Sequence, residues 1–131
     1  MIPLKKNAII AVDFDGTCVK HADFPDIGAD IGAAHWLKAW ASAGARIILW
    51  TVRGDEELKP AVKWFKDNGI RLWGINENPE QAGWSKSPKA HAHLFVDELA
   101  FGAPVIQPKE GRAYLDWSKV GPAVLSALMK K

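Results

Sequence analysis

The sequence predicts an α/β fold in which a parallel β-sheet has helices on both faces. Short apolar runs rich in β-branched residues, at 7–13, 45–51 and 93–97, are typical of strands buried on both faces. Segments with the helical spacing of apolar residues follow the first two runs. Strands that alternate with helices form βαβ units, which build a parallel sheet. We expect one domain over residues 1–131, because the chain contains no internal repeat or linker.

The first half of the chain contains the clearest elements. The first strand, 7–13, ends in Asp13. Apolar residues then recur at i, i+3, i+4 and i+7 from Ala33 to Trp40, and Gly44 follows as a helix stop. The second strand, 45–51, ends in Thr51. Acidic residues at 55–57 favour the start of a second helix, which we expect to end at 68–69.

The second half of the chain is less regular. A weaker third strand at 70–75 is followed by Asn76 and by a loop rich in Gly, Ser and Pro. The fourth strand, 93–97, ends in Asp97. A short fifth strand at 104–106 and a terminal helix at 120–129 complete the predicted elements.

The composition excludes several classes of protein. The chain is 48% hydrophobic with a net charge of +2, which argues against disorder and leaves no bulk charge for nucleic-acid binding. No apolar run approaches the roughly 20 residues that span a bilayer, and the N-terminus lacks the order of a signal peptide. The lone Cys18 cannot form an intramolecular disulfide and is expected to be a small packed residue. We therefore expect a soluble, cytoplasmic protein with no membrane partner.

Polar residues follow the predicted strands at the points where each strand ends. These residues are Asp13, Thr51, Asn76 and Asp97. Because right-handed βαβ connections bring the carboxyl ends of parallel strands to one edge of the sheet, we expect these four residues to converge on one crevice.

The residues at this edge suit phosphoryl transfer. An ordinary carboxyl pKa near ~3.9 would leave Asp13 ionised and ready to act as a nucleophile. A neighbouring negative charge and partial burial would let Asp15 hold a proton and act as general acid and base. Asp97 completes a set of oxygen ligands that suits Mg²⁺. Thr51 would donate a hydrogen bond to a phosphoryl oxygen, and a Lys from the loop before the fourth strand would neutralise charge.

At this point the sequence resembles a known family. Four motifs of the haloacid dehalogenase-like (HAD) superfamily are matched in order, over about residues 7–104. They are Asp13-Phe14-Asp15-Gly16-Thr17, the apolar strand that ends in Thr51, a Lys ahead of the fourth strand, and Val96-Asp97-Glu98. The resemblance implies a three-layer, doubly wound, Rossmann-like core.

The same resemblance implies a role for each matched residue. Asp13 would be the nucleophile that forms an aspartyl-phosphate, and Asp15 would be the general acid and base that also offers its backbone carbonyl to Mg²⁺. Thr51 and the Lys would bind phosphate, and Asp97 would bind the metal. Glu98 stands where Asp is commoner, so its share in the metal shell stays open. The Lys is either Lys89, which we prefer, or Lys86.

The chain leaves no room for a cap domain. The stretches available for one, 16–27 and 76–89, are too short to bury a core of their own, so the protein resembles the small capless phosphatases of the superfamily. An open site requires a large substrate, specificity loops or an oligomeric partner to exclude water. Our candidates for substrate contact are Arg53, Asn76, Asn78 and Trp84, with a solvated charge as the alternative for Arg53 and loop packing or an oligomer contact for Trp84.

The predicted function is a Mg²⁺-dependent phosphomonoester hydrolase. Its substrate stays open between a nucleotide, a nucleic-acid terminus, a sugar phosphate and a phosphoprotein. The alternatives are a phospho-receiver-like signalling domain, disfavoured because Asn76 follows the third strand where a phosphorylated Asp is usual, and a non-catalytic phosphate-binding module. His91 and His93 share one face of a strand, but without a third ligand we expect them to be surface or edge residues.

Overall fold

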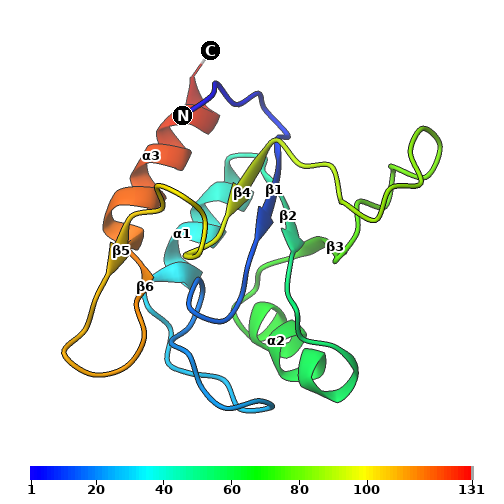
Figure 1. The fold of residues 1–131 in the computed structure, drawn as a ribbon. Coiled ribbons are helices and arrows are strands. Elements are labelled where there is room, and N and C mark those ends of the chain that lie inside the picture. The colour runs from blue at the N-terminus through cyan, green and yellow to red at the C-terminus, as the bar shows by residue number, and fades with distance from the viewer. Residues whose placement is uncertain (131) are drawn as a thin grey trace.

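The computed structural model describes residues 1–130 and confirms the predicted α/β class. Its centre is a parallel sheet with the strand order β3-β2-β1-β4 (Figure 1). The strands are β1 (Ile9–Val12), β2 (Arg46–Leu49), β3 (Leu72–Ile75) and β4 (Leu94–Val96). The chain adds β2 and β3 on one side of β1 and then returns to place β4 on the other side. This reversal beside β1 is where ligands bind in doubly wound sheets.

Three helices accompany the sheet within residues 1–130, namely α1 (Ala33–Ser42), α2 (Asp55–Asp67) and α3 (Trp117–Met129). The carboxylate of Asp30 accepts hydrogen bonds from the first amides of α1, including that of Ala33 at 2.8 Å. The Asp116 side chain accepts a bond from the amide of Ser118, which starts α3 three residues earlier than its apolar pattern predicts. None of these helices is long and apolar enough to cross a membrane.

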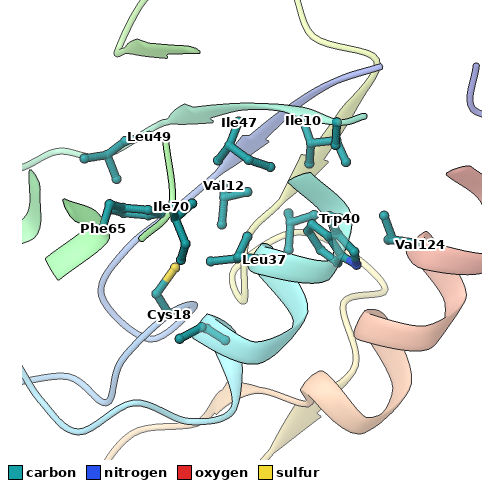
Figure 2. Packing of buried hydrophobic residues seen from close by; sticks show 14 of the residues in the cluster. Ile10, Val12, Cys18, Leu37, Trp40, Ile47, Leu49, Phe65, Ile70 and Val124 are labelled. Carbon is teal, nitrogen blue, oxygen red and sulfur yellow. The ribbon is translucent and has the colours of Figure 1, made fainter. Parts of the chain in front are cut away.

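The main core lies on one face of the sheet. Side chains from β1 and β2 meet side chains from all three helices there (Figure 2), among them Ile10, Val12, Ile47, Leu49, Leu37, Trp40, Phe65 and Val124. The other face carries a smaller cluster of Ile9, Ala11 and Ile48, with Trp50, Trp73 and Ala92 packed against it. Residues 76–93 form a loop, as their Gly, Ser and Pro residues predict. The three helices of residues 1–130 pack into the main core, so the expectation of helices on both faces is not met.

The predicted fifth strand forms, but outside the main sheet. β5 (Val105–Ile106) pairs antiparallel with β6 (Tyr114–Leu115) to make a separate hairpin. The amide of Leu115 donates a 2.9 Å hydrogen bond to the carbonyl of Gly16, and the indole of Trp117 donates to the carbonyl of Thr17 at 2.6 Å. These two hydrogen bonds therefore join the hairpin and the start of α3 to the loop that follows β1.

His93 connects the approach to β4 with β1, and this contact makes stability depend on pH. Its Nδ1 accepts a 2.9 Å hydrogen bond from the amide of Ile9. Burial, followed by the positive charges of His91, Arg46 and Lys5, lowers the pKa of His93 from its ordinary value. The unfolded chain then binds the proton more readily than the folded chain, so stability is full above the unfolded pKa of about 6.5 and falls as the pH drops through it.

We expect the change His93→Asn, whose side-chain oxygen can accept the same bond, to flatten part of this dependence. The measurement is the melting temperature of both proteins from about pH 7.5 to about pH 5.5. Carboxyl groups that titrate in this range contribute equally to both proteins, so the difference between the two curves isolates His93. Parallel curves would show that His93 carries no part of the pH dependence.

Candidate functional site

Three carboxylates converge where β1 and β4 end. Asp13 follows β1, and Asp97 and Glu98 follow β4, whose Val96 pairs with Val12 of β1. One side-chain oxygen from each acid lies within 4.8 Å of the others. They line a cavity of about 480 Å³, together with Asp15 and His21.

Glu98, whose role the sequence left open, is a full member of this cluster. It is buried, and its amide donates a 3.1 Å hydrogen bond to the Thr17 hydroxyl, which in turn donates to Oδ2 of Asp13 at 2.9 Å. His21 Nε2 lies 2.7 Å from Glu98 Oε2. Gly16 has a φ of 83°, and a Cβ there would collide with the Glu98 carboxylate, so glycine is required on both counts. These contacts fix the orientation of Glu98.

The crowded acids change each other's protonation. Burial, followed by the charge of Asp97, raises the pKa of Asp13 to about 8. Burial and the contact with Asp97 raise the pKa of Glu98 to about 7. The expectation of an ordinary pKa for Asp13 is therefore wrong for the chain without a cation. A cation among the three acids would favour their ionised forms.

The chemistry of the donor set fits a hard divalent cation. All three candidate ligands offer carboxylate oxygens, which suit Mg²⁺ better than zinc or copper. The residues that would hold it are Asp13, Asp97 and Glu98, with the backbone carbonyl of Asp15 as a further predicted ligand.

We expect the change Asp97→Asn to raise the melting temperature without metal and to abolish the stabilisation by Mg²⁺. Without added metal, the variant should melt at a higher temperature than the unaltered protein, because the charge of Asp97 no longer opposes ionisation of Asp13 and Glu98. Millimolar MgCl₂ should raise the melting temperature of the unaltered protein, since a ligand that binds only the folded state stabilises it. It should have little effect on the variant.

A suitable control for this comparison is Asp67→Asn, because Asp67 lies on the surface in an ion pair with Lys63. The control should respond to MgCl₂ as the unaltered protein does. An equal response of Asp97→Asn and the control would rule out Asp97 as a metal ligand.

Arg53 was expected from the sequence to be either a substrate contact or a solvated charge, and the structure shows neither. It is 1% exposed, and its guanidinium grips Asp15 with two hydrogen bonds, Nε to Oδ2 at 2.7 Å and Nη2 to Oδ1 at 2.8 Å. The other three N–H groups donate to the carbonyls of Pro25, Asp26 and Glu57. Arg53 is thus neither a solvated charge nor a substrate contact, because all five donors are used inside the protein.

Asn76 and Asn78 hold loops in place. The Asn76 side-chain oxygen accepts a 2.7 Å hydrogen bond from the amide of Thr51, and the Thr51 hydroxyl accepts one from the amide of Arg53 at 3.1 Å. Asn78 is buried and donates to the carbonyl of His91 at 3.0 Å. Thr51 thus lies at the predicted sheet edge, but neither it nor either Asn lines the acidic cavity. Of the four residues expected to converge on one crevice, Asp13 and Asp97 line this cavity, and Thr51 and Asn76 do not.

Trp84 and the two lysines lie away from the acidic cavity. Trp84 is 67% exposed, packs edge-on against His91 with ring centroids 5.6 Å apart, and lines a separate hollow with Lys89. Lys89 Nζ lies 5.6 Å from the ring centroid of Phe95, whose partner in β1 is two residues before Asp13. Lys86 lines a third hollow. Neither lysine lines the acidic cavity.

No family model and no curated protein matches the chain. Among solved structures, the chain is similar to a conserved protein from Bacteroides thetaiotaomicron, with 31% sequence identity and a TM-score of 0.73. The alignment covers 96% of this chain and 100% of that one. The chain belongs to the family of this Bacteroides protein. The shared family confirms the fold.

In this member of the family, three residues that the sequence did not single out lie at the acidic site. They are Thr17, which bridges Asp13 and Glu98, His21, which contacts Glu98, and Arg112, which lines the cavity. Thr17 and His21 follow Asp13 by four and eight residues, so their closeness in sequence is a usable signal. Arg112 reaches the site only through the hairpin, which no local pattern reveals.

Proposed function

We propose that the protein is a Mg²⁺-dependent phosphomonoester hydrolase of the HAD type, with Asp13 as nucleophile and Asp15 as general acid and base. The observation that carries the proposal is the meeting of Asp13, Asp97 and Glu98 at the carboxyl ends of neighbouring parallel strands, with Asp15 in the same cavity. Nucleophile, proton carrier and cation ligands would then share one site.

The contacts of Asp13 suit a nucleophile. The Thr17 hydroxyl holds Oδ2, which leaves Oδ1 to attack phosphorus. A bound Mg²⁺ would supply positive charge that offsets the repulsion between this carboxylate and the phosphoryl group. Oδ1 forms the bond to phosphorus while the bond to the alcohol oxygen breaks. The product is an aspartyl-phosphate on Asp13 and a leaving alcohol that needs a proton.

Asp15 is held in position to move that proton. Arg53 occupies one lone pair on each carboxylate oxygen, so a second lone pair on each remains available. One of these remaining lone pairs would hold the proton that Asp15 gives to the leaving oxygen. The water that attacks the aspartyl-phosphate would later return a proton to the same carboxyl group. Attack of this water releases phosphate and restores Asp13. Arg53 is thus a positioning residue for Asp15.

Two further residues would bind the phosphoryl oxygens. The Thr51 hydroxyl oxygen accepts a hydrogen bond from the backbone amide of Arg53, so its own proton is free to be donated to a phosphoryl oxygen. Lys89 would reach the phosphoryl group by swinging its flexible stem from Phe95 towards Asp13. The single Cys18 is buried, which suits a reducing compartment, and we propose the cytoplasm as the location.

The test is hydrolysis of 4-nitrophenyl phosphate by the purified protein, followed by a panel of nucleotides, sugar phosphates, end-phosphorylated oligonucleotides and phosphopeptides. We expect release of phosphate that stops with EDTA and returns with excess MgCl₂. No release from any ester would contradict the proposal. An acyl-phosphate that persists for hours would instead indicate a phospho-receiver.

A further inference from the structure

Arg112 is a cation at the acidic cavity that the proposed reaction does not use. It lies between β5 and β6 and lines the same cavity as Asp13, Asp97 and Glu98. Its guanidinium has no ion pair with any acid in the described part of the chain. A guanidinium without a protein partner beside a cavity is well suited to bind an anionic group of a ligand.

The hairpin holds Arg112 close to the catalytic loop. Three residues after Arg112, the buried Leu115 donates its amide hydrogen bond to the carbonyl of Gly16. Beside it, the ring of Tyr114 lies under the ammonium group of Lys20, 5.6 Å from the ring centroid. Arg112 therefore belongs to a segment anchored at the site rather than to a distant surface loop.

No other permanent cation within residues 1–130 lines this cavity. The charge of Arg53 is neutralised by Asp15, and both Lys86 and Lys89 line other hollows. The cavity wall itself is rich in carboxylates, which repel an anionic substrate. Even with a divalent cation bound to the three acids, that cluster would keep one negative charge, and Asp23 adds another to the cavity wall. Arg112 is therefore the permanent cation of this lining that an anionic group of a substrate would meet.

Burial separates the floor of this cavity from its rim. Glu98 is 8% exposed, whereas Val52 is 91% and Leu99 is 76% exposed, and Phe24 and Arg112 are also exposed. A phosphoryl group at Asp13 on the floor would therefore point its leaving group towards a rim of apolar side chains that carries the carboxylate of Asp23 and one guanidinium, that of Arg112.

We propose that Arg112 binds a second anionic group on the leaving group of the substrate. The substrate class would be a phosphate monoester that carries a further phosphate or carboxylate, with its apolar part against Phe24, Val52 and Leu99. This inference rests on the proposed function, because it assumes that a phosphate monoester is hydrolysed at Asp13. Binding of the second anion by Arg112 can occur without hydrolysis.

The test compares phenyl phosphate with 2-, 3- and 4-carboxyphenyl phosphate, which place a carboxylate at three distances from the same reactive group. At least one carboxyphenyl ester should have a kcat/KM about tenfold above that of phenyl phosphate, as expected for one charged hydrogen-bonded pair. The change Arg112→Ala should remove this preference, and Arg112→Lys should restore part of it. The control Lys109→Ala, in the same connection but outside the cavity lining, should keep it. Equal preference in Arg112→Ala and the unaltered protein would overturn the inference.

The matching phosphonates separate this inference from the proposed function. If no ester is hydrolysed, the function fails, and calorimetric binding of phenylphosphonate and the carboxyphenylphosphonates with MgCl₂ still tests Arg112. We expect about tenfold tighter binding of one carboxyphenylphosphonate, lost in Arg112→Ala. Equal binding of all four phosphonates by the unaltered protein would overturn the inference on this route.

Discussion

Replacement of Asp13 by Asn is expected to lower kcat/KM for a phosphate monoester at least about a thousandfold. The amide is a far weaker nucleophile than a carboxylate, so no acyl-phosphate can form at the normal rate. The fold should survive, because the Asn side-chain oxygen can still accept the hydrogen bond from the Thr17 hydroxyl. The measurement is steady-state release of phosphate with saturating MgCl₂, together with a melting curve of the variant.

Trapping identifies the residue that carries the phosphoryl group. Borohydride reduces an aspartyl-phosphate to homoserine, and mass spectrometry of the digested protein should find this change at Asp13 in the unaltered protein. The exposed Asp67→Asn variant should retain full activity and the same labelled peptide. Activity above a tenth of normal in Asp13→Asn, with the substitution verified by mass, would remove Asp13 from the proposed mechanism.

The second large effect concerns stability. The change Arg53→Ala should lower the free energy of unfolding by about 3–5 kcal/mol, because it leaves a partly buried carboxylate without its cation. It also removes the donors to three backbone carbonyls. Arg53→Lys should be intermediate, since an ammonium group cannot reproduce the planar fork. Unfolding in urea, followed by circular dichroism, measures each value.

Two further variants make the stability experiment specific. Lys59→Ala breaks an exposed ion pair with Glu56 and should cost less than about 1 kcal/mol. The double change Asp15→Asn with Arg53→Met should cost less than the sum of its single changes, because both charges are removed together. A loss below about 1 kcal/mol in Arg53→Ala would mean that the buried pair adds little to stability.

The sequence was a good guide wherever chain order alone decides position. Asp13 and Asp97 each follow a buried apolar run, and parallel pairing of β1 with β4 brings such ends together whatever the side chains in between. The same logic placed Thr51 and Asn76 at this edge too, but neither residue lines the acidic cavity. The cluster of Asp13, Asp97 and Glu98 could therefore be anticipated in outline from one chain.

Residues whose role depends on packing between distant segments were beyond sequence reasoning. Arg53 has its carbonyl partners at Pro25, Asp26 and Glu57, and no spacing rule predicts that they surround one guanidinium. The loop between β3 and β4, with Gly83 and Pro88, is predicted from its composition, but the general βαβ pattern wrongly predicts helices on both faces of the sheet. The position of Arg112 at the cavity depends on the β5–β6 hairpin, which the hydrogen bond from the Leu115 amide to the Gly16 carbonyl holds in place.

The bond between the indole of Trp117 and the carbonyl of Thr17 spans 100 residues of sequence. A growing chain on the ribosome can form β1 and its acidic loop early, but it lacks this partner and the neighbouring Leu115 until nearly the whole domain has emerged. The segment Asp13–Thr17 is therefore translated early, but the hydrogen bonds from Leu115 and Trp117 that hold it form only at the end of synthesis. A nascent chain that ends before residue 115 would carry most of its acidic side chains and still lack a finished site.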